Sequence, residues 1–131
     1  MDSASPAAID GLAQVALTMA DVPAALVFYR DILGLRLLFS AGPDLAFLEA
    51  GGVRLMLTTP RGHGEPGKNS ALYFRVQDLA ATYAAVVARG AAPERAPALT
   101  ARRPDHELWM AFVRDPEGNL VGLMSEVRAP A

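Results

Sequence analysis

Residues 110–124, MAFVRDPEGNLVGLM, place two apolar runs on either side of the segment DPEGN at residues 115–119. Proline fixes φ within this segment and glycine permits a positive φ, so we predict a tight turn between two antiparallel strands. A similar pattern occurs at residues 45–57, LAFLEAGGVRLML, where two glycines separate the apolar runs. Because AFL at 46–48 also matches AFV at 111–113, the sequence predicts a repeated hairpin.

The repeat extends upstream of both hairpins. Residues 15–34, VALTMADVPAALVFYRDILG, align with residues 72–90, LYFRVQDLAATYAAVVARG, when Asp21 is set against Asp78. In each copy a short alternating strand precedes the aspartate, and a helical pattern follows it and ends at glycine. Aspartate accepts the free N–H groups of a first helical turn, and glycine adopts the left-handed conformation that ends a helix. The sequence therefore predicts two strand–helix–strand–strand–strand modules and the α+β class.

We expect these modules to form one domain of ordinary size for 131 residues. The first module spans residues 12–59 and the second spans residues 70–126. Residues 60–69 are rich in glycine and proline and form the expected linker. Short tails at residues 1–11 and 127–131 complete the chain.

Composition and charge exclude several functions. The chain has 52% hydrophobic and 20% charged residues, which is typical of a globular protein. It has no cysteine, which excludes disulfides, thiolate metal sites and a cysteine nucleophile. The formal charge of -2 provides no basic face, so nucleic acid is not an expected partner. The first residues have no basic region followed by a long apolar run, and no stretch reaches about 18 apolar residues, so we expect a cytoplasmic protein without a membrane partner.

Hydrophobic periodicity predicts the individual elements. The helical stripe of the first module consists of Val22, Leu26, Tyr29 and Leu33, and it should lie on the apolar face of the sheet. The expected elements are a strand at 12–19, a helix at 22–33, strands at 35–40, 45–50 and 53–59, a strand from residue 72, a helix at 79–89, an edge strand at 91–101, a charged loop at 102–107, and strands at 108–114 and 120–125.

Alternation along the strands assigns each side chain to one of two sheet faces. On the first strand, the apolar positions 15, 17 and 19 should face the helix and leave the intervening positions on the other face, which we expect to be a cavity wall. The side chains predicted to lie on the faces away from the helices are Gln14, Ala16, Thr18, Arg54, Met56, Thr58, Ala71, Tyr73, Arg75, Gly122 and Met124.

With its modules assembled, the chain resembles the vicinal oxygen chelate superfamily, which includes glyoxalase I, methylmalonyl-CoA epimerase, extradiol dioxygenases and bleomycin- and fosfomycin-resistance proteins. The resemblance covers roughly residues 12–126. Its marks are VPAALVFYRDILGL at residues 22–35, DPEGN at residues 115–119, and the repeat itself. The resemblance implies two βαβββ modules whose curved mixed sheets surround a cavity, and it also implies a homodimer.

The resemblance further implies a test for a metal ion. In the metal-bearing members, four cavity-facing His, Glu or Gln side chains hold a divalent cation and leave positions open for two substrate oxygens. The matching positions in this chain are Gln14, Met56, Ala71 and Gly122. Only Gln14 has a side chain able to ligate such a cation, so we expect no metal cofactor. The alternative is one divalent ion held by Gln14 together with His106, Glu49 or Glu126.

Several residues are candidates for ligand binding. Tyr73 and Arg75 combine a phenol with a guanidinium, which suits an anionic or oxygen-rich ligand, although rim ion pairs are the simpler alternative. Trp109 alternates against Met110 and Phe112, so packing or interface formation competes with ligand stacking. The candidate ligand-binding set is Gln14, Thr18, Arg54, Met56, Tyr73, Arg75, Trp109, Gly122 and Met124.

Other residues are weighed for catalysis. His106 is a candidate base, but its charged neighbours also fit a surface loop histidine, and His63 lies in the linker, where we expect it to be solvated. We interpret residues 115–119 as structural. The glycines at 51–52 lack the strand and helix context of a nucleotide-binding loop.

The leading hypothesis is a metal-independent protein that binds an apolar or aromatic, oxygen-bearing small molecule, as the drug-binding resistance members do. A metal-dependent lyase, isomerase or dioxygenase of the same superfamily is the second hypothesis. A metal-free enzyme that uses His106 or Tyr73 for proton transfer is the third.

Overall fold

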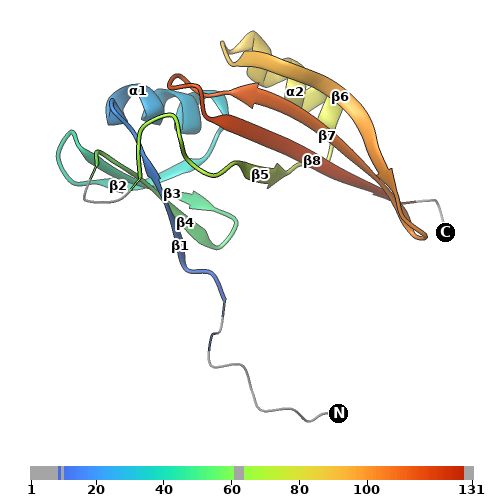
Figure 1. The fold of residues 1–131 in the computed structure, drawn as a ribbon, viewed down its shortest axis with the longest axis horizontal. Helices are drawn as coiled ribbons and strands as arrows, with labels where there is room; N and C mark the ends of the chain where they lie inside the picture. The colour runs from blue at the N-terminus through green and yellow to red at the C-terminus, as the bar shows by residue number, and fades with distance from the viewer. Residues whose placement is uncertain (1–8, 10, 61–63, 129–131) are drawn as a thin grey trace.

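The structure, a computed structural model, describes residues 9, 11–60 and 64–128. These residues form two four-stranded sheets, each with a helix on one face (Figure 1). The sheets have strand orders β1-β4-β3-β2 and β5-β8-β7-β6, so each element of the first module has its equivalent in the second. The predicted α+β fold of two βαβββ modules is confirmed.

In the first module, β1 runs parallel to β4, and β3 pairs antiparallel with both β4 and β2. The parallel pair is joined by the helix and two further strands, whereas the antiparallel pairs are joined by short turns. The elements of this module are β1 (Gln14–Thr18), α1 (Val22–Leu26), η1 (Val27–Ile32), β2 (Arg36–Ser40), β3 (Leu45–Ala50) and β4 (Val53–Thr58).

The second module repeats this pairing, and its β6, β7 and β8 are longer than the equivalent strands of the first module. Its β6 lies at the edge of the sheet, as its prolines predicted, and its pairing with β7 has several register shifts. The elements of this module are β5 (Leu72–Arg75), α2 (Leu79–Ala88), β6 (Ala92–Arg102), β7 (His106–Arg114) and β8 (Leu120–Arg128).

Both helices begin and end as the sequence predicts. Asp21 accepts a hydrogen bond from the Ala24 N–H, and Asp78 accepts one from the Ala81 N–H, each at 3.0 Å. Gly34 and Gly90, which follow the two helices, have φ values of +86° and +113°. A side chain at either position would be strained, which explains why glycine ends both helices.

The first helix differs from the prediction of one regular helix over residues 22–33. It becomes a π-helix at Val27, and the Leu33 N–H donates to the Phe28 carbonyl five residues earlier at 2.9 Å. The wider turn rotates the later side chains around the helix axis. Phe28 and Tyr29 are therefore buried, whereas the predicted stripe residues Leu26 and Leu33 are only half-buried.

The predicted charged loop at 102–107 is also corrected. Arg102 still belongs to β6 and His106 already belongs to β7, so the loop is a short hairpin connection. In addition, β8 continues to Arg128, beyond the predicted end at residue 125. Cross-strand ion pairs, including the one from Arg102 to Glu107, join this distal part of the sheet, so charged residues here are compatible with strand pairing.

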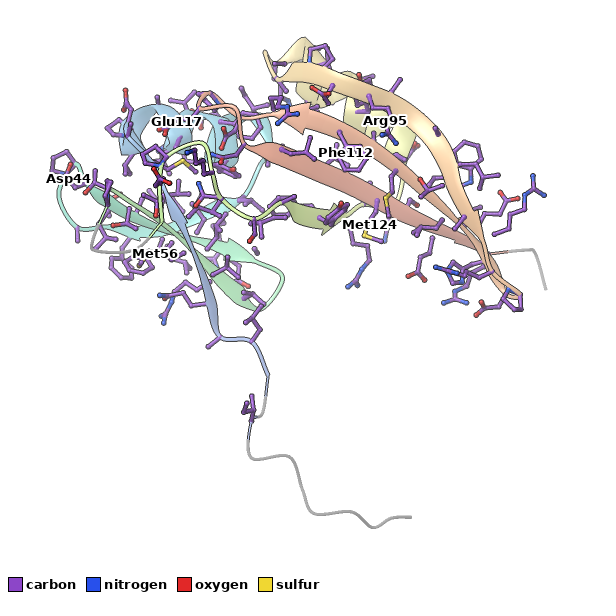
Figure 2. All side chains as sticks on the ribbon, viewed as in Figure 1. Asp44, Met56, Arg95, Phe112, Glu117 and Met124 are labelled. Atoms are coloured by element: carbon purple, nitrogen blue, oxygen red, sulfur yellow. The ribbon has the colours of Figure 1, made fainter. Side chains whose placement is uncertain are left out.

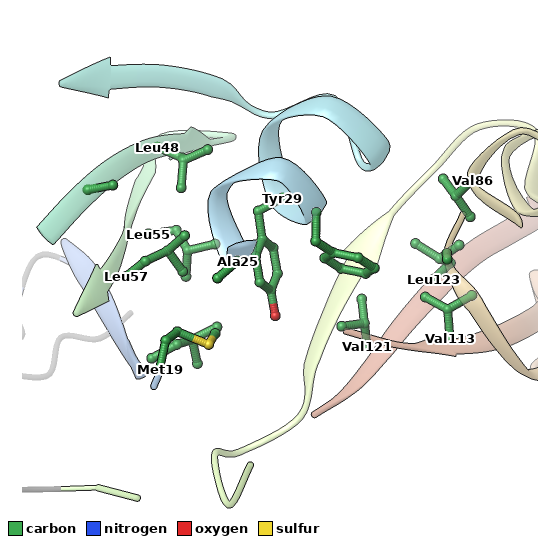
Figure 3. Close-up of a cluster of buried hydrophobic side chains, with 14 of the residues drawn as sticks. Met19, Ala25, Tyr29, Leu48, Leu55, Leu57, Val86, Val113, Val121 and Leu123 are labelled. Atoms are coloured by element: carbon green, nitrogen blue, oxygen red, sulfur yellow. The ribbon is translucent and has the colours of Figure 1, made fainter. Parts of the chain in front are cut away.

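The core lies between the helices and the sheet faces that they cover (Figure 3). Leu17 in β1 and Met19 directly after it are buried on the helix side of the sheet, as alternation predicts. Burial of a leucine-sized side chain stabilises a fold by about 1.5–3 kcal/mol. The other large contributors are Phe28, Tyr29, Leu48, Leu55, Leu57, Val86, Val113, Val121 and Leu123.

The turn at residues 115–119 connects the two modules. Its Glu117 carboxylate accepts the backbone N–H groups of Ala20 and Asp21 at 2.7 and 2.9 Å, directly before α1. Its Asp115 carboxylate accepts the buried Tyr29 hydroxyl at 2.9 Å. Burial, and then the charge of Asp115, raise the pKa of Tyr29 well above its usual range, so the phenol remains a hydrogen-bond donor.

The linker strengthens this junction. The Asn69 side chain accepts the Thr18 N–H and donates to the Thr18 carbonyl, both at 2.9 Å, so it pairs with β1 as a further strand residue would. It also donates to the Asn119 side-chain oxygen at 3.1 Å. The turn, the linker and the start of α1 therefore form one hydrogen-bonded unit. The linker histidine, His63, lies outside the described residues.

Candidate functional site

The helix-free face of the first sheet carries part of the predicted set, and we call it the first-sheet surface. Gln14 and Glu49 lie on either side of Arg54 in register, and the Arg54 Nε donates to the Gln14 Oε1 at 2.8 Å. The Gln14 Nε2 lies 3.6 Å from the Met56 sulfur, so these two matched positions share one face as predicted. The Arg54 guanidinium also lies over the Phe47 ring, 5.7 Å from its centroid.

An exposed aromatic pair extends the first-sheet surface toward its edge. Phe39 stacks on Phe47 with ring centroids 4.6 Å apart, and Phe39 remains 51% exposed. The stacked pair, with the Arg54 guanidinium over Phe47, forms an aromatic patch that a partner molecule could cover. Sequence reasoning missed this pair because a register shift between Leu37 and Phe39 interrupts the alternation of β2.

Thr18 does not reach the first-sheet surface. It belongs to the predicted ligand-binding set, but it is only 2% exposed, and the Asn69 side chain holds its backbone. Its place in the fold is therefore the junction between modules.

The helix-free face of the second sheet carries an aromatic platform, and we call this face the second-sheet surface. The Tyr73 ring lies over Gly122, where an added Cβ would come within 2.6 Å of the ring. The same ring meets Phe112 edge-on at 5.8 Å, and the Arg95 guanidinium lies 5.2 Å from the Phe112 ring centroid. Tyr73 is 50% exposed, so one side of this platform is open to a ligand.

Two further predicted residues lie beside the platform. Arg75 is exposed and lies two positions along β5 from Tyr73. Met124, which is labelled in Figure 2, pairs in register with Arg75 and with Met110. The second-sheet surface thus combines aromatic rings, thioethers and guanidinium groups. This combination suits an apolar ligand that carries an oxygen acceptor.

Trp109 lies on the opposite face of the second sheet. It packs against the core on the helix side, and its indole N–H donates to the Glu107 carboxylate at 3.1 Å. Its predicted alternation against Met110 and Phe112 therefore agrees with the packing alternative, and Trp109 does not contribute to the second-sheet surface.

His106 lies at the far end of β7. Its Nδ1 is 2.8 Å from the Asp105 carboxylate, which also accepts the Arg128 guanidinium at 2.6 Å. The Arg128 and then the His106 hydrogen bonds lower the pKa of Asp105 to about 2. Since Phe112, which contacts Tyr73, is six positions along β7, His106 lies roughly 20 Å from the platform. His106 and Tyr73 therefore do not act on the same substrate atom within one chain.

The four matched positions do not fit a divalent metal. The Gln14 amide already contacts Arg54 and Met56, a thioether and a methyl group occupy two other positions, and the Tyr73 ring covers Gly122. No group of three His, Cys, Asp or Glu side chains that could hold an ion occurs among the described residues.

The alternative metal ligands are also engaged elsewhere. Glu49 accepts the Gly52 N–H at 2.6 Å and is separated from Gln14 by the Arg54 cation. Glu126 pairs with Arg128 at 3.3 Å on the other sheet. These carboxylates therefore do not converge with Gln14 on one point.

A cleft of about 660 Å³ lies between the two modules. It meets both surfaces at Arg54, Tyr73 and Arg75, but most of its walls come from the helix side of the sheets. Sequence reasoning did not find this cleft, because its walls come from separate modules. Among the described helices, none has the length and apolar character needed to cross a membrane.

Comparisons with known proteins agree with the fold. The model of the Glyoxalase/Bleomycin resistance protein/Dioxygenase superfamily matches residues 11–123. Lactoylglutathione lyase from Agrobacterium tumefaciens is 25% identical, with a TM-score of 0.74 over 91% of this chain and 96% of that chain. No curated protein matches the sequence significantly.

Two further solved structures share the fold at lower identity. TnmS3, an antibiotic binding protein from Streptomyces sp. CB03234, is 24% identical, with a TM-score of 0.75 over 92% of this chain and 99% of that chain. A glyoxalase-related enzyme from Fulvimarina pelagi is 21% identical, with a TM-score of 0.71 over 89% and 88%. The family match over most of the sequence, together with the repeated βαβββ modules, means that this chain belongs to the Glyoxalase/Bleomycin resistance protein/Dioxygenase superfamily.

Proposed function

We propose that this protein binds an apolar or aromatic, oxygen-bearing small molecule without a metal ion. The observation that carries the proposal is the Tyr73 ring over Gly122, at a position where the family resemblance implies a metal ligand. A ligating side chain at residue 122 and the present ring position exclude each other. An aromatic platform thus takes the space of a metal donor.

The chemistry of the second-sheet surface defines the ligand class. Tyr73 offers a half-exposed ring and a hydroxyl group, which suit stacking and one hydrogen bond. Arg75 and Arg95 supply guanidinium groups that prefer oxygen acceptors. The ligand is therefore a planar or apolar molecule with a carbonyl, phenol or carboxylate.

The binding site is completed by a second copy of the chain. The first-sheet and second-sheet surfaces belong to separate sheets, and each exposes an aromatic ring, Phe39 at 51% and Tyr73 at 50%. A homodimer that places one surface opposite the other would remove both rings from water. Such an arrangement would enclose the ligand between an Arg54 side and a Tyr73 side.

The test uses exhaustively chelated protein and a panel of aromatic compounds, including antibiotics because TnmS3 is named as an antibiotic binding protein. Calorimetry should find a ligand whose dissociation constant rises about tenfold or more in Tyr73→Ala, since an aromatic pair contributes about 0.5–1.5 kcal/mol beyond the apolar area that it buries. The control Arg103→Gln, in the exposed turn between β6 and β7, should bind as the unmodified protein does. Near-stoichiometric uptake of Ni, Zn, Mn or Fe that is abolished by Gln14→Ala would overturn the proposal in favour of a metal-dependent enzyme.

A metal-free enzyme is the second candidate, and the Asp105–His106 contact favours it. A carboxylate on Nδ1 orients an imidazole so that Nε2 can accept a proton. Turnover that survives chelation and Tyr73→Phe but is lost in His106→Gln would support this candidate. Turnover that persists in His106→Gln would exclude His106 as the base.

A further inference from the structure

Most of the wall of the cleft between the modules belongs to neither the first-sheet surface nor the second-sheet surface. Its volume of about 660 Å³ lies within the range of small-molecule sites. It shares Arg54, Tyr73 and Arg75 with the surfaces described above, and its remaining walls are largely aliphatic. The aliphatic side chains that define it best are Leu33, Leu35, Val53, Leu55, Val86 and Leu123.

Unequal hairpin turns explain why the cleft is open. In the second module, residues 115–119 separate β7 from β8, and Glu117 reaches the connection before α1. In the first module, only Gly51 and Gly52 separate β3 from β4, and they have φ values of +63° and +92°. This turn is shorter and has no side chains to fill the equivalent space beside Gln77, before α2.

The charge of the cleft has one sign. Among the described residues that line it, Arg54 and Arg75 are the charged side chains, and none is an aspartate or a glutamate. The Arg54 Nε is held by Gln14. The Arg75 side chain is exposed and has no hydrogen bond or ion pair with another described residue. A guanidinium beside an apolar cavity favours a ligand with a carboxylate and an apolar tail.

We propose that the inter-module cleft binds an amphipathic carboxylate, with its tail against Leu35, Leu55 and Val86 and its carboxylate at Arg75. This site is additional to the aromatic platform. Burial of the apolar tail in such a cleft favours binding by about 25 cal/mol per Å² of apolar surface. The guanidinium then selects a carboxylate head group over a neutral one. Because Arg75 belongs to both sites, a change at Thr82, which lines the cleft but not the platform, distinguishes carboxylate binding in the cleft from binding at the platform.

The experiment compares decanoate with its neutral analogue decanol by calorimetry on the full-length protein. Decanoate should bind at least about tenfold more tightly than decanol, because a charge-assisted hydrogen bond contributes roughly 1.5–3 kcal/mol. Arg75→Gln should weaken decanoate about tenfold and leave decanol unchanged. Arg103→Gln, at an exposed position between β6 and β7 and outside the cleft, is the matched control and should leave both affinities unchanged.

A second pair of variants tests the location. Thr82→Trp places a large ring in the cleft from α2 and should weaken both compounds, whereas Ala84→Trp, exposed on the same helix and outside the cleft, should weaken neither. Absence of decanoate binding to the unmodified protein would overturn the proposal. Equal affinities for decanoate and decanol, or an unchanged decanoate affinity in Arg75→Gln or Thr82→Trp, would also overturn it. Decanoate binding that disappears as the chain dimerises would likewise overturn it, because the second copy would then fill the cleft.

Discussion

At the scale of single residues, Gly122 decides the shape of the second-sheet surface. Its strand position is buried and has an ordinary negative-φ backbone, so the glycine is not required by local conformation. It is required by the Tyr73 ring, which an added Cβ would approach to 2.6 Å. Tyr73 and Gly122 therefore pack as one unit, and a substitution at one residue should change the stability effect of a substitution at the other.

Gly122→Ala should destabilise the protein by about 1–3 kcal/mol because the Tyr73 ring must leave its contact with Phe112. Urea unfolding measures the loss. In a Tyr73→Ala background the same substitution should cost much less, since the obstructing ring is absent. Equal costs in the two backgrounds would contradict this account.

Tyr29→Phe should also destabilise the fold by about 1–3 kcal/mol, because it leaves the buried Asp115 carboxylate without the hydroxyl donor at 2.9 Å. Tyr83→Phe is the matched control, since the Tyr83 hydroxyl has no hydrogen bond to another described residue. Guanidinium unfolding compares the two variants. A Tyr29→Phe protein as stable as the control would show that the Tyr29 hydroxyl does not stabilise the junction.

At the scale of elements, the two hairpin turns have diverged in function. The turn at 115–119 extends far enough to place a carboxylate on the backbone before α1. In the first module, the Glu49 carboxylate on β3 accepts the Gly52 N–H, so its contact remains within the same hairpin. The junction between the turn at 115–119 and the start of α1 is therefore closed by hydrogen bonds. The equivalent space between residues 51–52 and the start of α2 remains open and forms part of the cleft.

Glu117→Ala should cost about 1–2 kcal/mol, the usual loss for a capping carboxylate, because the N–H groups of Ala20 and Asp21 lose their acceptor. Amide hydrogen exchange should show faster exchange at these two residues. Glu126→Ala, whose carboxylate contacts only exposed Arg128, is the control and should be nearly neutral. Unchanged exchange at residues 20 and 21 would contradict the capping role.

The distal end of the β6–β7 hairpin should respond to acid. The pKa of Asp105 is lowered from 3.8 to about 2, so its stabilising effect is complete above pH 4 and is lost as the pH falls through about 2. The melting temperature of Asp105→Asn should therefore lie below that of the unmodified protein at neutral pH and converge with it toward pH 2. A carboxyl titration by NMR with a midpoint near 3.8 would contradict this assignment.

At the scale of the whole molecule, each sheet has one face covered by a helix and one face without a helix. The helix-free faces carry Phe39 and Tyr73, which are half-exposed in the single chain. Burial of such rings is a substantial driving force for association. The two modules of one chain therefore leave surfaces that a second chain can cover.

We expect a homodimer at micromolar concentration, measured by sedimentation velocity. Phe39→Ser should raise the dimer dissociation constant about tenfold or more, because it removes an exposed aromatic ring from the contact. Val127→Ser, at an equally exposed apolar position on the distal end of β8, is the comparison variant and should have a smaller effect. A monomer at all accessible concentrations would exclude the shared site.

The sequence by itself determined the modules, their helix caps and the faces of their strands. These features depend on spacings of two or about four residues and on the backbone preferences of aspartate, glycine and proline, as the Asp21 and Asp78 caps illustrate. It also indicated that Gln14 and Met56 share a face, because strand alternation reports on facing directly.

Only the tertiary structure decided how the site is assembled. The Tyr73 ring over Gly122, the hydrogen bonds of the Asn69 side chain to the Thr18 backbone, and the cleft between the modules each depend on segments distant in sequence. The π-helix at Val27–Ile32 and the bulge in β2 also break the regular periods on which sequence reasoning depends. Local periodicity fixes which way a side chain points, whereas packing between modules fixes what it meets.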